Sequence, residues 1–148
     1  MELVFQQTVS PVFSFNANAN IYRTVVDSFT VLSLYPVPTV FTAGKQTQTS
    51  GNIKWNGMFK LRRQTEIQLT AIYLAPDIIP QGKIGTRFSV DMGVKKQIQQ
   101  GKGELFLNAT DLFNTLQIER TINGNGFTLH STDYYETQVF RIGYSRMF

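Results

Sequence analysis

The strongest constraint on how this chain folds is a strict alternation of apolar and polar side chains. Between residues 11 and 22, Phe13, Phe15 and Ile21 occupy odd positions, while the even positions from residue 14 onward carry serine, asparagine and tyrosine. A pleated strand places two such sets on opposite faces, whereas a helix would scatter both around its circumference. This segment therefore predicts a β-strand with one apolar and one polar face.

The same alternation returns along the whole chain, and no segment predicts a helix. The predicted strands are residues 11–22, 53–62, 66–73, 87–95, 104–110 and 140–148, with a partial strand at residues 1–7. The longer segments match the ~9–11 residues of a tilted membrane-spanning strand and exceed the ~5–6 residues of an ordinary globular strand. Strand length therefore favours a membrane barrel over a β-sandwich.

The connections between these strands alternate in length. Residues 8–10, 62–65 and 97–102 form short connections, while residues 27–50, 75–83 and 114–136 form longer ones that we expect to be loops. Outer-membrane barrels have short periplasmic turns and long extracellular loops. We therefore expect an all-β fold: an antiparallel up-and-down meander of about seven strands, part of a transmembrane outer-membrane β-barrel.

Strand number and the first residues predict a larger protein. Seven strands leave two open edges, which lipid does not tolerate, and bacterial single-chain barrels close with an even number from eight upward. Residues 1–7 carry no basic segment and no apolar run of a signal peptide. We expect residues 1–148 to be the C-terminal part of a transmembrane barrel, without a signal peptide, and the remainder of the barrel to lie upstream.

Composition argues against several other functions. The charged fraction is 16%, low for a soluble domain, and the aromatic fraction is 13%. The basic residues behind the net charge of +4 are scattered, so we expect no nucleic-acid partner. There is no cysteine, and His130 is the single histidine, in a segment expected to be a flexible loop. We expect no catalytic residue, no metal and no cofactor.

The polar faces of the predicted strands carry more basic than acidic side chains. The basic residues predicted to face the lumen are Lys54, Lys60, Arg62, Arg87, Lys95 and Arg141. They are opposed by Glu66, Asp91 and Glu104. Such a face would dock an acidic face of a plug or pass anionic solutes; the alternative is a solvated barrel wall without a specific role.

Aromatic residues near the strand ends predict girdles at the two membrane interfaces, where amphipathic rings prefer to lie. The predicted outer girdle consists of Tyr22, Tyr73, Phe113, Tyr134 and Tyr135, and Phe148 is placed at the inner interface. The alternative is that these rings belong to the core of a soluble β-sandwich.

The last strand ends in a terminal phenylalanine with apolar residues at alternate positions before it. This pattern resembles the sorting signal that the barrel-assembly machinery reads, and it is carried by Phe140, Ile142, Tyr144 and Phe148. Arg146 departs from the pattern, because that position is usually apolar or aromatic. The alternative is an ordinary amphipathic strand that ends in phenylalanine.

The segment Asp111-Leu-Phe-Asn114, followed by a long connection and a final strand, is similar to the ending of TonB-dependent receptors. The chain resembles in particular the outer membrane protein beta-barrel family of large receptors. The other matching elements are residues 2–7, 21–24, 73–76 and 81–82. The resemblance implies a barrel of about 22 strands, of which this chain is the final third, with a plug domain and an energy-coupling segment upstream.

Three functions follow as hypotheses. The first is ligand uptake across the cell outer membrane, with outer-membrane lipid, the barrel-assembly machinery, the upstream barrel and plug, and the TonB complex as partners. The second is a small structural or adhesive outer-membrane barrel. The third is a soluble lipocalin-like binding protein with its apolar faces turned inward; exposed Trp55, Phe59 and Phe88 would argue against it.

Overall fold

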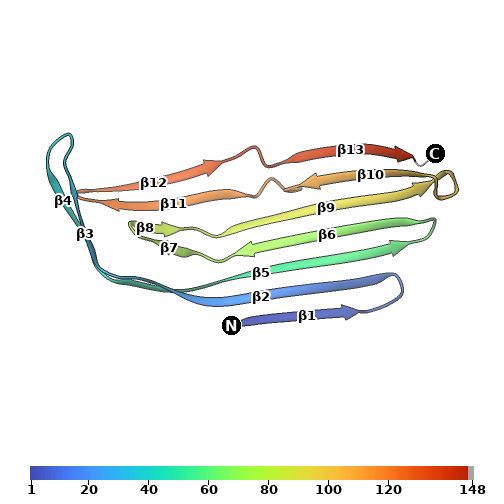
Figure 1. Ribbon diagram of the computed structural model, residues 1–148, viewed down its shortest axis with the longest axis horizontal. Helices are drawn as coiled ribbons and strands as arrows, with labels where there is room; N and C mark the ends of the chain where they lie inside the picture. The colour runs from blue at the N-terminus through green and yellow to red at the C-terminus, as the bar shows by residue number, and fades with distance from the viewer. Residues whose placement is uncertain (147–148) are drawn as a thin grey trace.

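The computed structural model describes residues 1–146 and consists of long antiparallel strands (Figure 1). Seven of them form one sheet in which sequence order and spatial order agree. In spatial order they are β1 (Glu2–Thr8), β2 (Phe13–Val26), β5 (Gln46–Leu61), β6 (Thr65–Leu74), β9 (Arg87–Ile98), β10 (Gly103–Thr110) and β13 (Val139–Arg146). The predicted all-β, antiparallel up-and-down meander of about seven strands is therefore confirmed.

Helical structure is limited, in residues 1–146, to one 3-10 turn at Gln99–Gly101. Within the same residues, no helix has the length and apolar character needed to cross a membrane.

The strand register separates apolar from polar side chains across most of the sheet. One transverse row contains Ala17, Trp55, Ala71 and Val90. The adjacent row contains Asn16, Asn56, Thr70 and Asp91. Because neighbouring rows point to opposite sides, the sheet has two distinct surfaces. We call the side that carries Trp55 the apolar face and the side that carries Asn56 the polar face.

The sheet has no hydrophobic core on either side. Ala43, Ile78 and Ala109 are the buried apolar residues in the part of the chain that the structure describes, and no large side chain is fully buried there. The accessible surface is 10556 Å², whereas a soluble monomer of this mass would expose about 7,700 Å². The apolar face must therefore be covered by something other than this chain.

Short connections gather at one end of the sheet, which we call the turn end; it lies on the right in Figure 1. The β5–β6 connection there is tight, and Arg63 and Gln64 both have positive φ, at 60° and 55°. A turn of this kind matches the twist of the two strands that it joins. Arg62 belongs to this turn, because β5 ends at Leu61. The prediction that Arg62 lies on the polar face of the strand is therefore wrong.

The longer connections form hairpins instead of the expected loops. The additional strands are β3 (Phe29–Ser33), β4 (Thr39–Ala43), β7 (Asp77–Ile79), β8 (Gly82–Ile84), β11 (Gln117–Gly124) and β12 (Phe127–Tyr134). Strands β12, β11, β8 and β7 form a second antiparallel sheet, and β3 pairs with β4. These strands occupy the other end of the molecule, the hairpin end, on the left in Figure 1.

Two of the main strands also extend beyond their predicted ends toward the hairpin end. Strand β2 continues to Val26, and β5 begins at Gln46 instead of residue 53. The added part of β5 is rich in threonine and glutamine, without an apolar set of alternating positions. The backbone hydrogen bonds between β2 and β5 continue there, but the side chains no longer alternate between apolar and polar. This part of the strand was therefore not recognisable from the sequence.

Candidate functional site

The polar face is joined across strands by uncharged side chains. Asn56 Nδ2 donates to Asn16 Oδ1 at 2.8 Å, and Thr70 Oγ1 donates to Asn56 Oδ1 at 3.0 Å. Asn20 Nδ2 donates to Asn52 Oδ1 at 3.3 Å, closer to the hairpin end. Amide and hydroxyl groups retain further donors and acceptors after these bonds. The polar face is therefore a surface suited to contact with water or polar ligands.

Charges on the polar face are distributed unevenly between its two ends. Near the turn end, Lys60 pairs in register with Glu66, and Glu66 pairs with Lys95. Lys95 Nζ lies 2.8 Å from Glu104 Oε2. Two lysines are thus matched by two glutamates at this end.

The other basic residues of the polar face lie farther toward the hairpin end. They are Lys54, Arg87 and Arg141, and the acidic side chains near that part of the face are Asp91 and Asp77, which reaches it from β7. The Nε atom of Arg87 is buried without a hydrogen-bond partner in the described part of the chain. The excess of positive charge on the polar face therefore belongs to these three residues.

One aromatic residue, Phe106, interrupts the polar face. It pairs with Gly143 of β13, and a side chain added at Gly143 would clash with the Phe106 ring. The ring therefore covers the exposed backbone of the glycine, an arrangement that stabilises glycine in sheets. Phe106 has a packing role within the sheet.

Asp111 lies just beyond β10, where the two sheets meet, and its carboxylate accepts four hydrogen bonds from described residues. Only 2% of its surface is exposed. Its carboxylate accepts hydrogen bonds from Thr137 Oγ1 at 2.6 Å, Thr115 N at 2.9 Å and Leu116 N at 3.1 Å. Its own N–H donates to Asp91 Oδ1 at 2.9 Å. Burial acts to raise the pKa of Asp111, but these hydrogen bonds outweigh it and hold the pKa below its ordinary value.

The other residues of the Asp111–Asn114 segment complete this junction. Leu112 O accepts a hydrogen bond from Gln138 Nε2 at 3.0 Å, and Asn114 Oδ1 accepts one from Tyr134 Oη at 2.6 Å. The segment thus ties the strand that leaves the main sheet to the strand that returns to it. Its polar residues fix how the hairpin end is attached.

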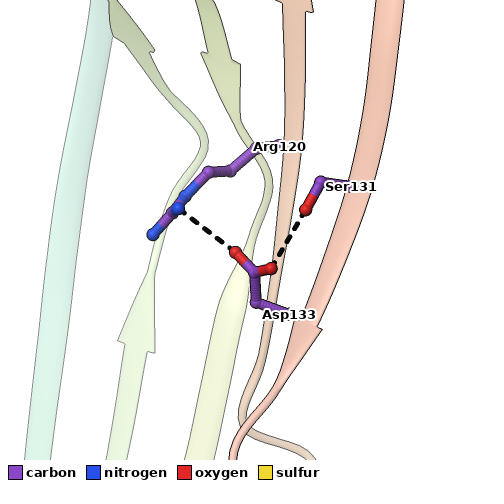
Figure 2. Close-up of polar contacts among 3 residues, drawn as sticks. All are labelled: Arg120, Ser131 and Asp133. Atoms are coloured by element: carbon purple, nitrogen blue, oxygen red, sulfur yellow. Dashed lines mark hydrogen bonds and ion pairs between the residues drawn. The ribbon is translucent and has the colours of Figure 1, made fainter.

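In the second sheet, Arg120 and Asp133 form an ion pair across β11 and β12 (Figure 2). Arg120 Nη1 lies 3.1 Å from Asp133 Oδ2, and Ser131 Oγ donates to Asp133 Oδ1 at 3.0 Å. Because both charged side chains are about one-third exposed, the pair contributes little to stability. It helps to fix the register of the two strands.

The residues predicted as an outer girdle separate into three groups. Tyr73 lies on the apolar face between Ile53 and Phe88, as a lipid-facing residue requires. Phe113, Tyr134 and Tyr135 lie exposed at the junction of the two sheets.

The prediction that Tyr22 belongs to the outer girdle is wrong. It is an even-numbered residue of β2 and therefore shares the polar face with Asn20. Its hydroxyl donates to Asp77 Oδ2 at 3.0 Å, and Thr24 Oγ1 donates to the same atom at 3.3 Å. Tyr22 therefore anchors β7 to β2 from the inner side and does not face lipid.

A cluster of aromatic rings at the turn end of the apolar face was not predicted from the sequence. Phe13 and Phe59 stack with ring centroids 4.6 Å apart, and Phe15 lies 5.6 Å from Phe5 and 6.4 Å from Trp55. The alternating phenylalanines of two adjacent strands were the available signal, because antiparallel pairing at the short turn brings them side by side. This cluster forms an aromatic belt at the end opposite to Tyr73.

The predicted assembly signal lies on the edge strand β13. Phe140, Ile142 and Tyr144 all lie on the apolar face, in register with Ala109, Leu107 and Leu105. Arg146 follows them on the same face at the turn end. Phe148 lies outside the described residues. Recognition of this segment by the assembly machinery stays a prediction.

His130 lies on β12, and the expectation that it sits in a flexible loop is wrong. Its Nδ1 atom is 3.1 Å from Thr121 Oγ1 on the neighbouring strand. Among residues 1–146, no three histidine, cysteine, aspartate or glutamate side chains gather closely enough to hold a metal ion.

Comparison with protein families identifies the architecture. The sequence model of the Outer membrane protein beta-barrel family matches residues 1–145. The chain belongs to this family. Searches of curated proteins and of solved structures gave no match. As an outer-membrane barrel protein it resides in the outer membrane, which sets aside the soluble lipocalin-like and β-sandwich alternatives.

Membership in an outer-membrane barrel family gives each surface of the sheet its environment. The apolar face contacts lipid and the polar face lines the lumen, because a barrel wall alternates in this way. The turn end is periplasmic and the hairpin end extracellular. On β2 the apolar run from Phe13 to Ile21 is followed by Arg23, and at about 3.4 Å per residue and a tilt near 40° it covers roughly 20–25 Å of membrane thickness.

Proposed function

We propose that this chain forms the C-terminal part of the wall of a TonB-dependent-receptor-like transporter that takes up a ligand across the outer membrane. The segment contributes barrel wall, extracellular hairpins and a C-terminal assembly signal. The observation that carries the proposal is the lumen face, which is mainly polar and holds three cations, Lys54, Arg87 and Arg141, that form no salt bridge with the described residues.

The two edges of the sheet are open for pairing with further strands. Within the described chain, β1 pairs only with β2 and β13 only with β10. Strands β1 and β13 run in the same direction, so antiparallel closure takes an odd number of further strands. Barrels of about 22 strands are wide enough to hold a plug in the lumen. The proposed barrel is of this wide class.

The charge of the lumen face supports a partner or cargo of negative charge. Lys54, Arg87 and Arg141 lie in the part of the face away from Glu66 and Glu104. An acidic face of a plug, or an anionic solute, complements this arrangement.

The proposal is tested by following solutes in the growth medium of the native bacterium. Wild-type cells, cells without this gene and cells without a functional TonB complex are compared by mass spectrometry of the medium. We expect one class of solute to be depleted by wild-type cells and left behind by both mutant strains. If the gene deletion leaves the depletion of every solute unchanged, the transport proposal is overturned.

A structural or adhesive role is a second candidate, and one feature favours it. The tip of the β3–β4 hairpin exposes Leu34 and Tyr35, the latter at 87% of its surface. Exposed apolar groups of this kind mark interaction sites. We expect Leu34→Ser/Tyr35→Ser to lower the adhesion of cells to surfaces if this role holds. Unchanged adhesion in a strain that still assembles the variant would remove this candidate.

A further inference from the structure

Basic side chains gather at the periplasmic end of the sheet, on the turns and on the lipid-facing side. We call this set the periplasmic basic rim. It consists of Arg62, Arg63, Lys96, Lys102 and Arg146. We propose that the rim binds the headgroups of anionic phospholipids, such as phosphatidylglycerol, in the periplasmic leaflet of the outer membrane. The proposal rests on the membrane assignment and not on transport.

The strand register places two members of the rim directly on the lipid face. Lys96 lies in one row with Thr65, Leu105 and Tyr144. Arg146 lies two residues beyond Tyr144 and is paired with Gly103. Both side chains therefore continue the apolar face at its periplasmic edge. A cation in this position reaches the headgroup level while its aliphatic stem stays in the apolar region.

Charges at this end are segregated by side. The acidic residues of this end, taken over residues 1–146, are Glu66 and Glu104, and both lie on the lumen face opposite Lys60 and Lys95. Among residues 1–146, the charged side chains on the lipid face and the turns of this end are all basic. The segregation matches a membrane surface that carries negative headgroups.

Arg63 gives a second, independent observation. It occupies a turn position with φ of 60°, where glycine or asparagine fits with less steric strain than arginine. Arg63 forms none of the salt bridges found among residues 1–146, so its charge on this turn is open to an external anion. The headgroup layer is the surface that this turn faces.

Tyr144 marks the depth of the rim in the membrane. Its ring lies on the lipid face, and its hydroxyl donates to Gln99 Oε1 of the periplasmic turn at 3.0 Å. Tyrosine with one apolar and one polar end is typical of the membrane interface. Lys96 shares the row of Tyr144, so its ammonium group lies at headgroup depth.

The test measures which lipids surround the protein. The protein purified from outer membranes is placed in phosphatidylcholine bilayers that contain spin-labelled phosphatidylglycerol or spin-labelled phosphatidylcholine. We expect the association constant for phosphatidylglycerol to be about fivefold or more above that for phosphatidylcholine, since one basic side chain at an anionic surface has an effect of this order. The preference should decline between 0.1 M and 0.5 M salt, because ions screen the attraction.

The variant Lys96→Gln/Arg146→Gln should lower the preference to about half or less, because only Arg62, Arg63 and Lys102 remain in the rim. The matched control Lys54→Gln/Arg141→Gln removes the same charge from the lumen face and should keep the preference. Because Arg146 lies in the predicted assembly signal, Lys96→Gln/Lys102→Gln is a second variant, and heat-modifiable gel migration checks that each protein is folded. A rim variant that keeps the full preference, or a control that loses it equally, overturns the proposal.

Discussion

The membrane sheet and the extracellular sheet are built from the same antiparallel pairing, but their side chains are arranged differently. In the membrane sheet, the row of Ala17, Trp55 and Ala71 is apolar throughout, and the next row is polar throughout. In the extracellular sheet, Ile122 shares a face with Arg120, and Ile78 lies in one row with Lys83. Pairing alone therefore does not separate polar from apolar residues; lipid on one side does.

The difference extends to how each sheet is held in place. The membrane sheet depends on solvation: lipid on one face, water or a plug on the other, and no core between. The extracellular sheet has water around it and depends on individual contacts, such as Tyr22 with Asp77 and Arg120 with Asp133. In the membrane sheet, the effect of a substitution on the free energy of unfolding should therefore depend on its depth in the membrane. In the extracellular sheet, it should depend on which single hydrogen bond or ion pair is lost.

The largest expected effect comes from a charge in the middle of the lipid face. Leu69 lies in one row with Gly57, Met92 and Ala109, in the centre of the apolar face. Leu69→Arg should destabilise the folded protein by about 2–4 kcal/mol, the cost of an arginine near the bilayer midplane. Reversible urea unfolding in lipid vesicles measures the change.

Two controls sharpen this result. Gln68→Arg, one residue earlier, points into the lumen, and Thr132→Arg lies on an exposed part of the extracellular sheet. Both should change the free energy of unfolding by no more than about 0.5 kcal/mol. A loss with Thr132→Arg as large as that with Leu69→Arg would contradict the difference drawn between the two sheets.

The second effect concerns the junction between the sheets. Asp111→Asn removes the charge that four side-chain and backbone donors of Thr115, Leu116 and Thr137 share. We expect a loss of about 1.5–3 kcal/mol, the range for hydrogen bonds to a charged group. Urea unfolding measures the loss, and hydrogen exchange at Thr115 and Leu116 should rise with it. Unchanged exchange at these two amides would show that the carboxylate does not hold the junction.

Asp111 also predicts a dependence of stability on pH. Its folded-state pKa is lowered, so its contribution is present above the unfolded-state pKa and is lost as the pH falls through the folded-state value. The stability difference between the protein and Asp111→Asn should therefore be constant near neutral pH and shrink in the acid range. A difference that grows on acidification would contradict the lowered pKa.

The membrane sheet could be predicted from the sequence because lipid imposes its pattern on every residue. The odd positions of β2 from Phe13 to Ile21 are apolar without exception, so strand and face are both readable. Arg62 was misplaced because the pattern does not show where a strand yields to a turn. Tyr22 was misplaced because an aromatic residue near a strand end resembles a girdle residue on either face; its position in the alternation with Asn20 decides the face.

The extracellular hairpins could not be predicted from hydropathy, because both of their faces mix polar and apolar residues. One local signal was nevertheless present: Asn125-Gly126 between two segments rich in β-branched residues is a typical hairpin turn. The role of Asp111 was equally hidden, since Thr137 lies 26 residues away in sequence. Contacts of that separation depend on how the hairpins return to the barrel.

A smaller effect is expected at the tip of the β11–β12 hairpin. Gly126 has φ of 80°, and Asn125 Nδ2 donates to Val40 O at 3.3 Å, which joins this tip to the β3–β4 hairpin. Gly126→Ala forces a side chain into the left-handed region and should cost about 1–2 kcal/mol locally. Hydrogen exchange should show faster opening of β11 and β12 only. Faster exchange in β5 or β6 would contradict independent opening of the extracellular sheet.

The smallest effect is expected for the ion pair in Figure 2. Arg120→Gln and Asp133→Asn each remove one partner of a contact whose side chains are 38% and 32% exposed. A double-mutant cycle should give a coupling energy of about 0.2–1 kcal/mol that falls with salt, as exposed pairs do. The residual strength of the hairpin then lies in its backbone pairing, in which Arg120 faces Ser131. A coupling energy well above this range would mean that the ion pair is shielded from solvent. The side of β11 that carries Arg120 would then contact another part of the barrel instead of water.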